Sequence, residues 1–286
     1  MKIELIASDS LGVRSMATYV ETKDCRIFID PSAALGPSRY GLPPAPQEVE
    51  MLEKTKRVIA EKAKGCDILV ISHYHYDHYD PSEAFYDDKK VFAKDISSNI
   101  NASQRGRGKE FREIVEDKCE LIYCDDSRYE IGDTRIRFSP PFFHGPSNVK
   151  LGYVIMTTVD DGETRLLHAS DVQGPVTREA ADYIIEEKPD ILIIDGPPTL
   201  FLGWRFSKKN LQDASDNLVR ILNTLEKCEV ILDHHLLRDL EYKTRFPKPY
   251  EVGGSRVKTF AEHLGLENNL LEAHRKELWE EAKTSI

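Results

Sequence analysis

Four potential metal ligands lie within six residues of one another at the end of a short apolar run, and this cluster restricts the fold more than any other feature of the chain. The run is DILVIS (67–72), whose β-branched residues predict a buried strand. The potential ligands that follow it are His73, His75, Asp77 and His78. Loops at the ends of buried strands are where layered α/β folds place their functional residues. We therefore expect strands and helices in layers, with a functional site at one sheet edge.

The residue types and their spacing in this cluster predict two divalent cations. Imidazole and carboxylate are ligands that zinc, iron and manganese accept in proteins. His73 and His75 are two residues apart, so their side chains point to the same side of an extended segment. Asp77 and His78 follow the expected turn and can face a second position. One cation that used all four groups would have no open position for a reactant. The alternative, a polar loop of hydrogen-bonded histidines, is disfavoured because three of the nine histidines of the chain fall here.

The composition indicates a globular protein of the cytoplasm. Of the 286 residues 40% are hydrophobic and 31% charged, and strand and helix signals alternate without a linker. We expect one α/β (α+β) domain over residues 1–286. The formal net charge of −10 disfavours nucleic acid as a partner. Five cysteines without a CxxC pair, no apolar run of membrane length and no signal peptide predict a cytoplasmic protein that does not bind a membrane. The oligomeric state is left open.

Hydrophobic periodicity predicts the order of the elements. Strands are expected at 2–7, 16–20, 25–30, 67–72, 90–93, 120–124, 134–139, 151–158, 164–169, 190–195 and 229–233. Helices are expected at 47–64, 108–117, 176–187 and 211–226, with a helical turn near 82–86 and C-terminal helices at about 255–264 and 268–283.

The segment HYHYDH matches the HxHxDH signature of the metallo-β-lactamase superfamily, and residues 1–240 resemble that superfamily in the same order. Asp30 ends an early strand, His144 precedes the strand LGYVI, Asp171 follows LLHAS, and His234 follows EVILD. The resemblance is nearest to an archaeal metallo-hydrolase branch. It implies a four-layer αβ/βα sandwich with the metal ions at one edge.

The resemblance also implies which residues bind the two ions. The first ion would take His73, His75 and His144, and the second Asp77, His78 and His234. Asp171 would bridge the two ions. His235 is the alternative to His234, and whichever of the two is not a ligand would support the site or contact the substrate. We expect zinc in the first place, with iron or manganese as alternatives.

Four further residues are candidates for supporting or substrate-binding roles. Asp30 either supports the histidine loop through a hydrogen bond or caps the turn before Pro31. His168 either orients a ligand or, as we prefer, is a core histidine with a backbone partner. Asp195 either lines the pocket or belongs to a purely structural turn. Arg205 is a candidate for binding an anionic substrate, because arginine binds phosphate and carboxylate through two parallel hydrogen bonds.

Two small cationic clusters bear on the substrate. They are Arg105, Arg107 and Lys109 in one case and Arg205, Lys208 and Lys209 in the other. We interpret both as solvated surface charge in preference to a phosphate clamp.

The function that fits best is a hydrolase whose two metal ions activate water against a small phosphodiester, ester or lactone. Asp77 and Asp171 are its expected catalytic residues, Asp77 by positioning the water or moving its proton. A nuclease is the main alternative, and a basic groove leading to the metals would favour it. A non-enzymatic metal sensor is the third. Aspartate at 171, where many β-lactamases have cysteine, argues against antibiotic hydrolysis. Histidine at 75, where the di-iron oxidoreductases have glutamate, argues against redox chemistry.

Overall fold

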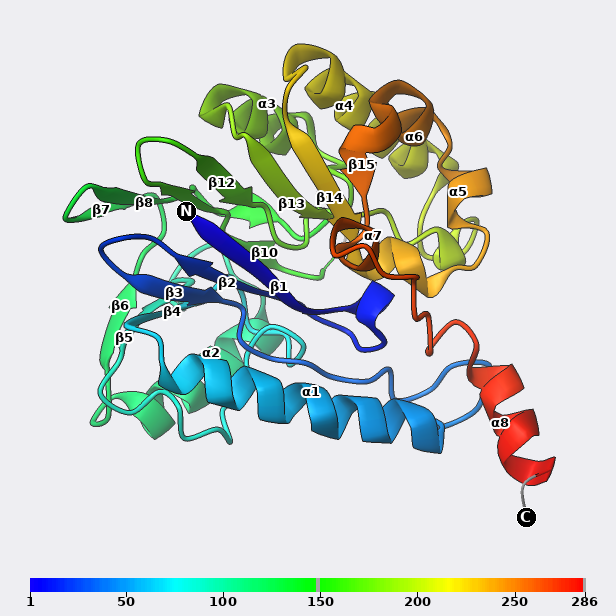
Figure 1. Cartoon of the computed structure of the whole chain (residues 1–286), viewed down its shortest axis with the longest axis horizontal. Helices are drawn as coiled ribbons and strands as arrows, with labels where there is room; N and C mark the ends of the chain where they lie inside the picture. The colour runs from blue at the N-terminus through cyan, green and yellow to red at the C-terminus, as the bar shows by residue number, and fades with distance from the viewer. Residues whose placement is uncertain (148–149, 285–286) are drawn as a thin grey trace.

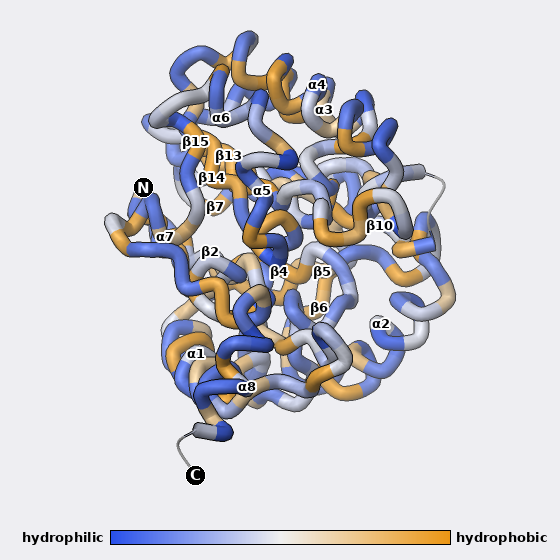
Figure 2. Tube along the Cα trace, turned by 90° about the vertical axis from the view of Figure 1, so that its right-hand side faces the viewer, coloured by the Kyte–Doolittle hydropathy of each residue, from blue (hydrophilic) through white to orange (hydrophobic). Residues whose placement is uncertain are grey.

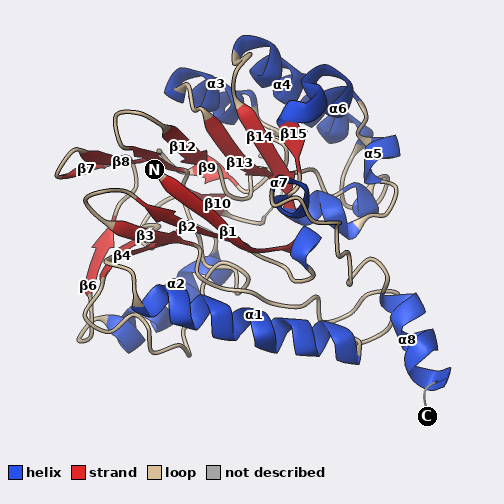
Figure 3. Cartoon of the chain, viewed as in Figure 1, coloured by secondary structure: helices blue, strands red, loops and turns tan. Residues whose placement is uncertain are grey.

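Two mixed β-sheets face each other, and helices cover the outer face of each sheet (Figure 1). The protein is described by a computed structural model over residues 1–147 and 150–284. The order of the layers is helices, sheet, sheet, helices, as Figure 3 shows by its colours. The predicted four-layer αβ/βα sandwich is therefore confirmed.

The first sheet has the strand order β1-β2-β3-β4-β5-β6. Strands β3 to β6 are parallel to one another. Strand β2 pairs antiparallel with β3, and β1 pairs antiparallel with β2. The strands are β1 (Lys2–Ser8), β2 (Met16–Glu21), β3 (Arg26–Ile29), β4 (Ile68–Ile71), β5 (Lys90–Ala93) and β6 (Glu120–Tyr123). Its outer face is covered by α1 (Pro46–Lys64) and α2 (Ala102–Val115).

The second sheet has the strand order β15-β14-β13-β12-β11-β8-β7, and β12 to β15 are parallel. Its strands are β7 (Arg128–Ile131), β8 (Thr134–Phe138), β11 (Thr157–Asp160), β12 (Arg165–His168), β13 (Ile191–Asp195), β14 (Glu229–Asp233) and β15 (Val257–Lys258). The helices α3 (Arg178–Glu187), α4 (Lys208–Thr224) and α6 (Lys248–Gly253) lie on its outer face. A separate pair of short strands consists of β9 (Phe142–Phe143) and β10 (Tyr153–Val154).

Alternation along the parallel strands explains why these segments are apolar on both faces. In β4, Val70 faces the core between the two sheets, while Leu69 packs against the helices below. In β14, Ile231 faces the same central core, and Val230 and Leu232 pack under α3 and α4. Figure 2 shows the resulting hydrophobic stretches on β13, β14 and β15. Because these strands are buried on both faces and carry apolar side chains, polar functional residues can lie only in the loops at the strand ends.

The C-terminal part differs most from the prediction. The helix expected at 255–264 is wrong, because the chain there forms the short helix η4 (Gly254–Arg256), strand β15 and the short helix α7 (Phe260–His263). Val257 pairs with Val230, so the open edge of the second sheet takes up this segment. The helix expected at 268–283 begins only at residue 275, as α8 (Arg275–Thr284). Local periodicity carries no information about such a sheet edge.

Three smaller predictions also need correction. The single strand expected at 151–158 is divided into β10 and β11, which belong to different sheets. The region 82–86 has turns and no helix. Helix α2 begins at Ala102, earlier than predicted, because the Asn101 side chain accepts a hydrogen bond from the backbone N of Gln104 at 2.7 Å and caps it. The sequence also did not reveal β7, β9 or α5 (Tyr242–Arg245).

None of the helices in the described part of the chain has both the length and the apolar character that crossing a membrane requires.

Candidate metal centre

All the candidate ligands except His144 come from loops at the carboxyl ends of parallel strands in the two sheets. His73, His75, Asp77 and His78 follow β4, and Asp171 follows β12. His234 and His235 begin the short helix η3 (His234–Arg238) directly after β14. His144 follows β9. Parallel neighbours end at the same edge of a sheet, so the stacked sheets bring these loops together.

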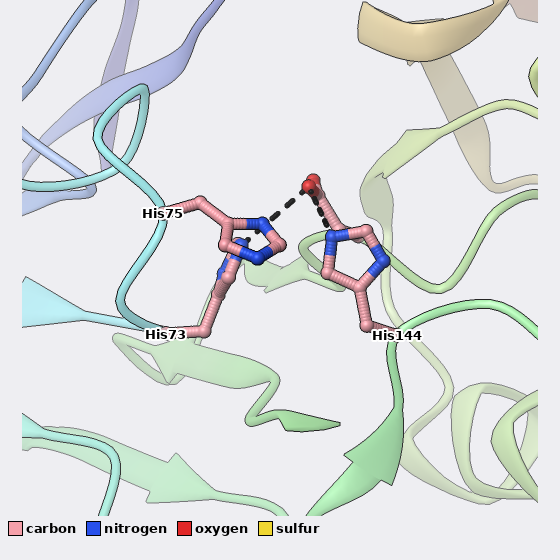
Figure 4. A group of neighbouring side chains, drawn as sticks. His73, His75 and His144 are labelled. Atoms are coloured by element: carbon pink, nitrogen blue, oxygen red, sulfur yellow. Dashed lines mark ion pairs between the residues drawn. The ribbon is translucent and has the colours of Figure 1, made fainter. Parts of the chain in front are cut away.

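The Asp171 carboxylate lies at the centre of the cluster. Its Oδ2 atom is within 4 Å of the Nε2 atoms of five histidines among the described residues. These distances are 3.0 Å for His144, 3.3 Å for His78, 3.6 Å for His73 and His234, and 3.8 Å for His235. Figure 4 shows His73, His75 and His144 around this point, with dashed lines for the ion pairs. The side chains singled out in the sequence thus converge, although they are up to 162 residues apart along the chain.

Three of the histidines are oriented by a buried carboxylate on the far side of the ring. The Nδ1 atoms of His78, His234 and His235 lie 2.8, 2.7 and 2.7 Å from Asp30, Asp9 and Asp195, respectively. Where the carboxylate is ionised it only accepts hydrogen bonds, and the Nδ1 atom that faces it then carries the proton. His73 is held in a similar way by the Ser72 hydroxyl at 3.0 Å. This arrangement turns the lone pairs of the Nε2 atoms toward Asp171, and it is the usual environment of metal-binding histidines.

The donor set fits divalent cations. The Nε2 atoms of His73 and His78, both ring nitrogens of His144 and both oxygens of Asp171 are buried without a hydrogen-bond partner. Leaving one such group unsatisfied costs about 1–3 kcal/mol. Lone pairs of neutral imidazoles that face a carboxylate oxygen also repel it, unless positive charge lies between them. Three overlapping groups of side chains have the spacing of a ligand set, namely His73, His75, His144 and Asp171, then Asp77, His78 and His234, and finally Asp171, His234 and His235.

The pKa values of the cluster also indicate that positive charge is needed at its centre. Burial and the neighbouring His144 lower the pKa of His75 to about 3, which keeps the imidazole neutral. Burial alone would lower the pKa of His234, but the carboxylates of Asp171 and Asp9 raise it to about 9. Burial likewise opposes ionisation of Asp171, yet His78 and His234 hold the pKa of its carboxyl well below the usual range. Protons or divalent cations can supply the positive charge that this carboxylate-rich centre requires.

Four of the nine non-glycine residues with a positive φ angle in the described chain lie in the loops around the centre. Asp30, Ser170, Gln173 and His234 have φ angles of 50°, 54°, 56° and 60°. This left-handed region is unfavourable for residues other than glycine, and it persists only where the surroundings enforce it. Asp30 and His234 are a supporting carboxylate and a candidate ligand, and Ser170 precedes Asp171. The fold therefore keeps strained backbone where the site needs particular side-chain directions.

The structure separates the residues whose roles the sequence left open. Asp30 supports the site, since it accepts hydrogen bonds from the backbone N of Ser72 at 2.8 Å and from His78. Asp195 orients His235. His168 does not reach the centre in this way, because its Nε2 donates to the Met16 carbonyl at 3.0 Å, as expected for a core histidine. His234 and His235 both lie at the centre, so the choice of His234 as the ligand stays a prediction.

Two functional residues, Asp9 and Arg238, were missed in the sequence. The Nε atom of Arg238 donates to Asp9 at 2.9 Å, and its Nη2 atom is 3.6 Å from Asp77. The same Nη2 is 3.3 and 3.2 Å from the two ring nitrogens of His234. A position equally far from both nitrogens lies over the face of the ring, because an in-plane position would collide with ring carbons. Arg238 follows His234 by four residues, a helical spacing that could have identified it.

A cavity of about 900 Å³ opens onto the centre. His75, Asp77, His144 and His235 form its floor, and Arg205 is among the side chains that line it. Arg205 is exposed and its guanidinium lies 4.1 Å from the centre of the Trp204 ring. The volume is near the upper end of the range of about 300–1,000 Å³ for ligand pockets. A small molecule can therefore reach the histidine cluster.

Comparison with known proteins places the chain in a family. A UPF0282 protein of Korarchaeum cryptofilum is 46% identical over 285 residues, which cover 98% of this chain and 95% of that protein. The chain belongs to the UPF0282 family. Its homologues are archaeal, as the resemblance implied. No family model matches the sequence.

Solved structures show that this UPF0282 member has the metallo-β-lactamase fold. The metallo-beta-lactamase fold protein YhfI from Bacillus subtilis aligns with a TM-score of 0.50 and 17% identity, over 85% of this chain and 92% of that one. A possible metal-dependent hydrolase from Veillonella parvula aligns with a TM-score of 0.57 and 13% identity, over 86% and 94%. At such low identity the likeness shows the fold alone, and the geometry of the His/Asp cluster is what indicates divalent metal binding.

Proposed function

We propose that the protein is a hydrolase with a binuclear metal site, which activates water against a small phosphodiester, ester or lactone. One observation carries the proposal: His75, Asp77, His144 and His235 line an open cavity, and the Nε2 atoms of His144 and His235 face the buried carboxylate of Asp171. A purely structural site or a closed sensor has no need of such an opening. The accessibility of the cluster therefore favours an enzyme over the sensor.

His73, His75, His144 and Asp171 would hold one cation, and Asp77, His78 and His234 would hold the other. Divalent cations bound there supply Lewis acidity and make a water molecule more acidic. Zinc is the first expectation, with iron or manganese as alternatives, because imidazole and carboxylate suit all three. Both His234 and His235 belong to a candidate ligand group, and we propose His234 as the ligand because it alone shares a group with Asp77 and His78.

The residues of the chain have separate tasks in this proposal. Asp77 lines the cavity and is the group that would orient the water and accept its proton. Burial alone would raise the pKa of Asp77, but His78, His234 and Arg238 lower it, so the carboxylate stays ionised and can accept a hydrogen bond from the water. Asp9, Asp30 and Asp195 hold the imidazoles in place. Arg238 lies beside Asp77 and lines the cavity, where its positive charge would stabilise the negative charge that develops on the attacked oxygen of the substrate.

Metal analysis combined with turnover tests the proposal. Purified protein should contain close to two equivalents of a divalent metal, measured by inductively coupled plasma mass spectrometry. It should hydrolyse at least one member of a panel of phosphodiesters, esters and lactones, beginning with bis(p-nitrophenyl) phosphate. A chelator should remove both the metal and the activity. Full turnover in metal-free protein, or fully metal-loaded protein that is inactive on the whole panel, would contradict the proposal.

A nuclease is the second candidate, since cations line the same cavity. Arg39, Arg107, Lys150 and Arg205 are among its lining residues. The sequence had suggested that Arg107 and Arg205 were solvated surface charges. Hydrolysis of single-stranded RNA with a steep dependence on salt would favour this candidate over a small-molecule hydrolase.

A further inference from the structure

The cavity above the candidate metal centre is strongly cationic, although the protein as a whole has a net charge of −10. Its cationic lining residues are Arg14, Arg39, Arg107, Lys150, Arg205 and Arg238, whereas its carboxylates are Asp77 and Glu272. Both carboxylates already have arginine neighbours, Glu272 with Arg14 at 2.6 Å and Asp77 with Arg238 at 3.6 Å. Bound cations would add to this positive charge. The surplus is therefore aimed at a ligand that carries negative charge.

The remaining arginines of the cavity are held in place without being neutralised. Within the described parts of the chain, no carboxylate lies within 4 Å of Arg39, Arg107 or Arg205. Arg107 stacks on the ring of Tyr76 at 4.8 Å and donates to the Tyr74 carbonyl at 2.8 Å. Ring faces and carbonyl oxygens orient a guanidinium but leave its full charge available. Such arginines suit the two-pronged recognition of phosphate oxygens.

Arg39 provides an independent sign of a missing partner. Its Nη2 atom donates to the Arg238 carbonyl at 3.0 Å, and its guanidinium lies 4.4 Å from the centre of the Tyr40 ring. Its Nε atom is buried and has no hydrogen-bond partner. Buried donors are rarely left unsatisfied in native proteins. Because Arg39 lines the cavity, an oxygen of a bound ligand is a suitable acceptor.

The rest of the lining is apolar and partly aromatic. Pro198, Leu200, Phe201 and Phe206 form one wall, and Tyr76, which is 50% exposed, contributes a ring on the side of Arg107. The ring of Tyr76 already packs against Tyr79 and Arg107, whereas Phe201 is a partly exposed ring beside Arg205. A ring in such a position can stack on an aromatic ligand or a nucleobase. A cavity of about 900 Å³ has room for such a group in addition to a phosphate.

We propose that the substrate is a small phosphodiester that carries an aromatic or nucleobase group, with its phosphate bound by Arg107 and Arg205 and its flat group on the apolar wall. This inference rests on the proposed hydrolase function, because it treats the cavity as the substrate site. The arginines come from separate parts of the chain: Arg107 lies in α2, Arg39 in the loop after β3, and Arg205 in the loop after η2 (Thr199–Phe201). Because each lies in a different element, they do not form one continuous basic segment, which favours a small molecule over a polynucleotide.

Two substrates with the same leaving group separate charge recognition from catalysis. One is the p-nitrophenyl ester of thymidine 5′-monophosphate, an anionic phosphodiester with a nucleobase, and the other is the neutral p-nitrophenyl acetate. In the metal-loaded full chain, Arg107→Gln and Arg205→Gln should each raise KM for the phosphodiester about tenfold, as expected for a lost charge-assisted hydrogen bond. KM for the acetate should change less than about twofold. Equal changes with both substrates, or no change with either, would overturn the inference.

Neighbouring cations provide matched controls. Arg105 lies in the same helix as Arg107, and Lys208 lies close to Arg205 in sequence, but neither lines the cavity. Arg105→Gln and Lys208→Gln remove the same charge and should leave both KM values unchanged. If the controls raise KM as much as the cavity variants, the effect is long-range and the proposed contacts are wrong. Unchanged metal content and unchanged thermal unfolding show that each variant is folded.

Equilibrium binding distinguishes a failure of this inference from a failure of the proposed function. Thymidine 5′-monophosphate should bind the metal-loaded protein in isothermal titration calorimetry, and Arg107→Gln should weaken it about tenfold, whether or not any substrate is turned over. Nucleotide binding without turnover of any substrate would support the inferred ligand class and contradict the proposed hydrolase function. Turnover of the acetate without nucleotide binding would support the hydrolase function and contradict the inferred ligand class. A ten-nucleotide single strand that binds far more tightly than the monophosphate, with a steep salt dependence, favours the nuclease and overturns the small-molecule inference.

Discussion

The two sheets contribute to the candidate centre in contrasting ways. The first sheet delivers His73, His75, Asp77 and His78 from a single turn after β4, so one local segment carries most of the ligand set. The second sheet delivers Asp171 after β12 and the pair His234 and His235 after β14, with Asp195 at the end of β13 between them. There the geometry depends on the register of the strands, in which Asp195 is paired with Asp233. A local cluster can be found in the sequence, whereas a distributed one exists only when the sheet has formed.

The largest expected effect compares one ligand from each region. His75→Ala removes a ligand from the loop after β4, and Asp171→Ala removes the carboxylate on which both ligand groups converge. Both should abolish turnover, and Asp171→Ala should lose both metal equivalents while His75→Ala retains one. Metal analysis by mass spectrometry, with circular dichroism to confirm the fold, makes the comparison. Full activity in either variant would defeat the ligand assignment.

The next effect compares the supporting carboxylates. Asp30 holds both the loop after β4, through the backbone N of Ser72, and the ring of His78, whereas Asp195 holds His235 and the backbone N of Gln173. Loss of such a partner typically lowers metal affinity about 10–100-fold. We expect Asp30→Asn to lie at the upper end of this range and Asp195→Asn at the lower end. Competition with a chromogenic chelator measures both, and the reverse order would show that the second sheet controls the site.

An intermediate effect concerns the ion pair between Arg14 and Glu272, which ties the loop before β2 to the C-terminal segment. Burial would raise the pKa of Glu272, but the Arg14 guanidinium lowers it to about 2 from its ordinary 4.5. A depressed pKa stabilises the folded state above the unfolded value, and this contribution is lost as the pH falls from about 4.5 toward 2. A shift of this size corresponds to about 3 kcal/mol. Urea unfolding should show a shallower loss of stability between about pH 5 and about pH 3 in Glu272→Gln than in the wild type.

The smallest effect is expected at His168, which is buried but does not reach the centre. Its ring donates to the Met16 carbonyl and so joins β12 to β2. His168→Gln should lower the free energy of unfolding by about 1 kcal/mol, the usual contribution of one hydrogen bond. Metal content and turnover should be those of the wild type. A metal content below that of the wild type would give His168 the orienting role that the structure does not indicate.

Much of the fold could be predicted because its strands are buried on both faces. Apolar runs such as 67–72 and 229–233 are unmistakable, and helix and strand alternate between them. The C-terminal segment could not be predicted in this way. Val257 and Lys258 form a strand only because the edge of the second sheet has unpaired backbone groups beside Val230. Periodicity describes one element at a time, and it contains no information on which edge is open.

The candidate centre likewise has a part that the sequence predicts and a part that only the folded structure shows. The HxHxDH segment by itself predicted a metal site, since the spacing of its ligands is local. Arg238 lies only four residues from His234, so its spacing is also local, although it was missed in the sequence. Asp9 could not be recognised as a partner of His234, because 225 residues separate the two. The cationic clusters were interpreted as surface charge for the same reason. Only the folded chain shows that Arg107 and Arg205 line one cavity.

The amino-acid sequence alone thus determined the layered architecture, the position of the ligand loop and the chemical nature of the ligands. Each of these follows from residue type and short-range spacing, which can be interpreted before the tertiary structure is known. The tertiary structure alone decided which carboxylate supports which imidazole, that both His234 and His235 reach the centre, and that the entrance is positively charged. Those properties depend on distances between segments far apart in the chain, and they arise only when the two sheets pack and bring their loops to one edge.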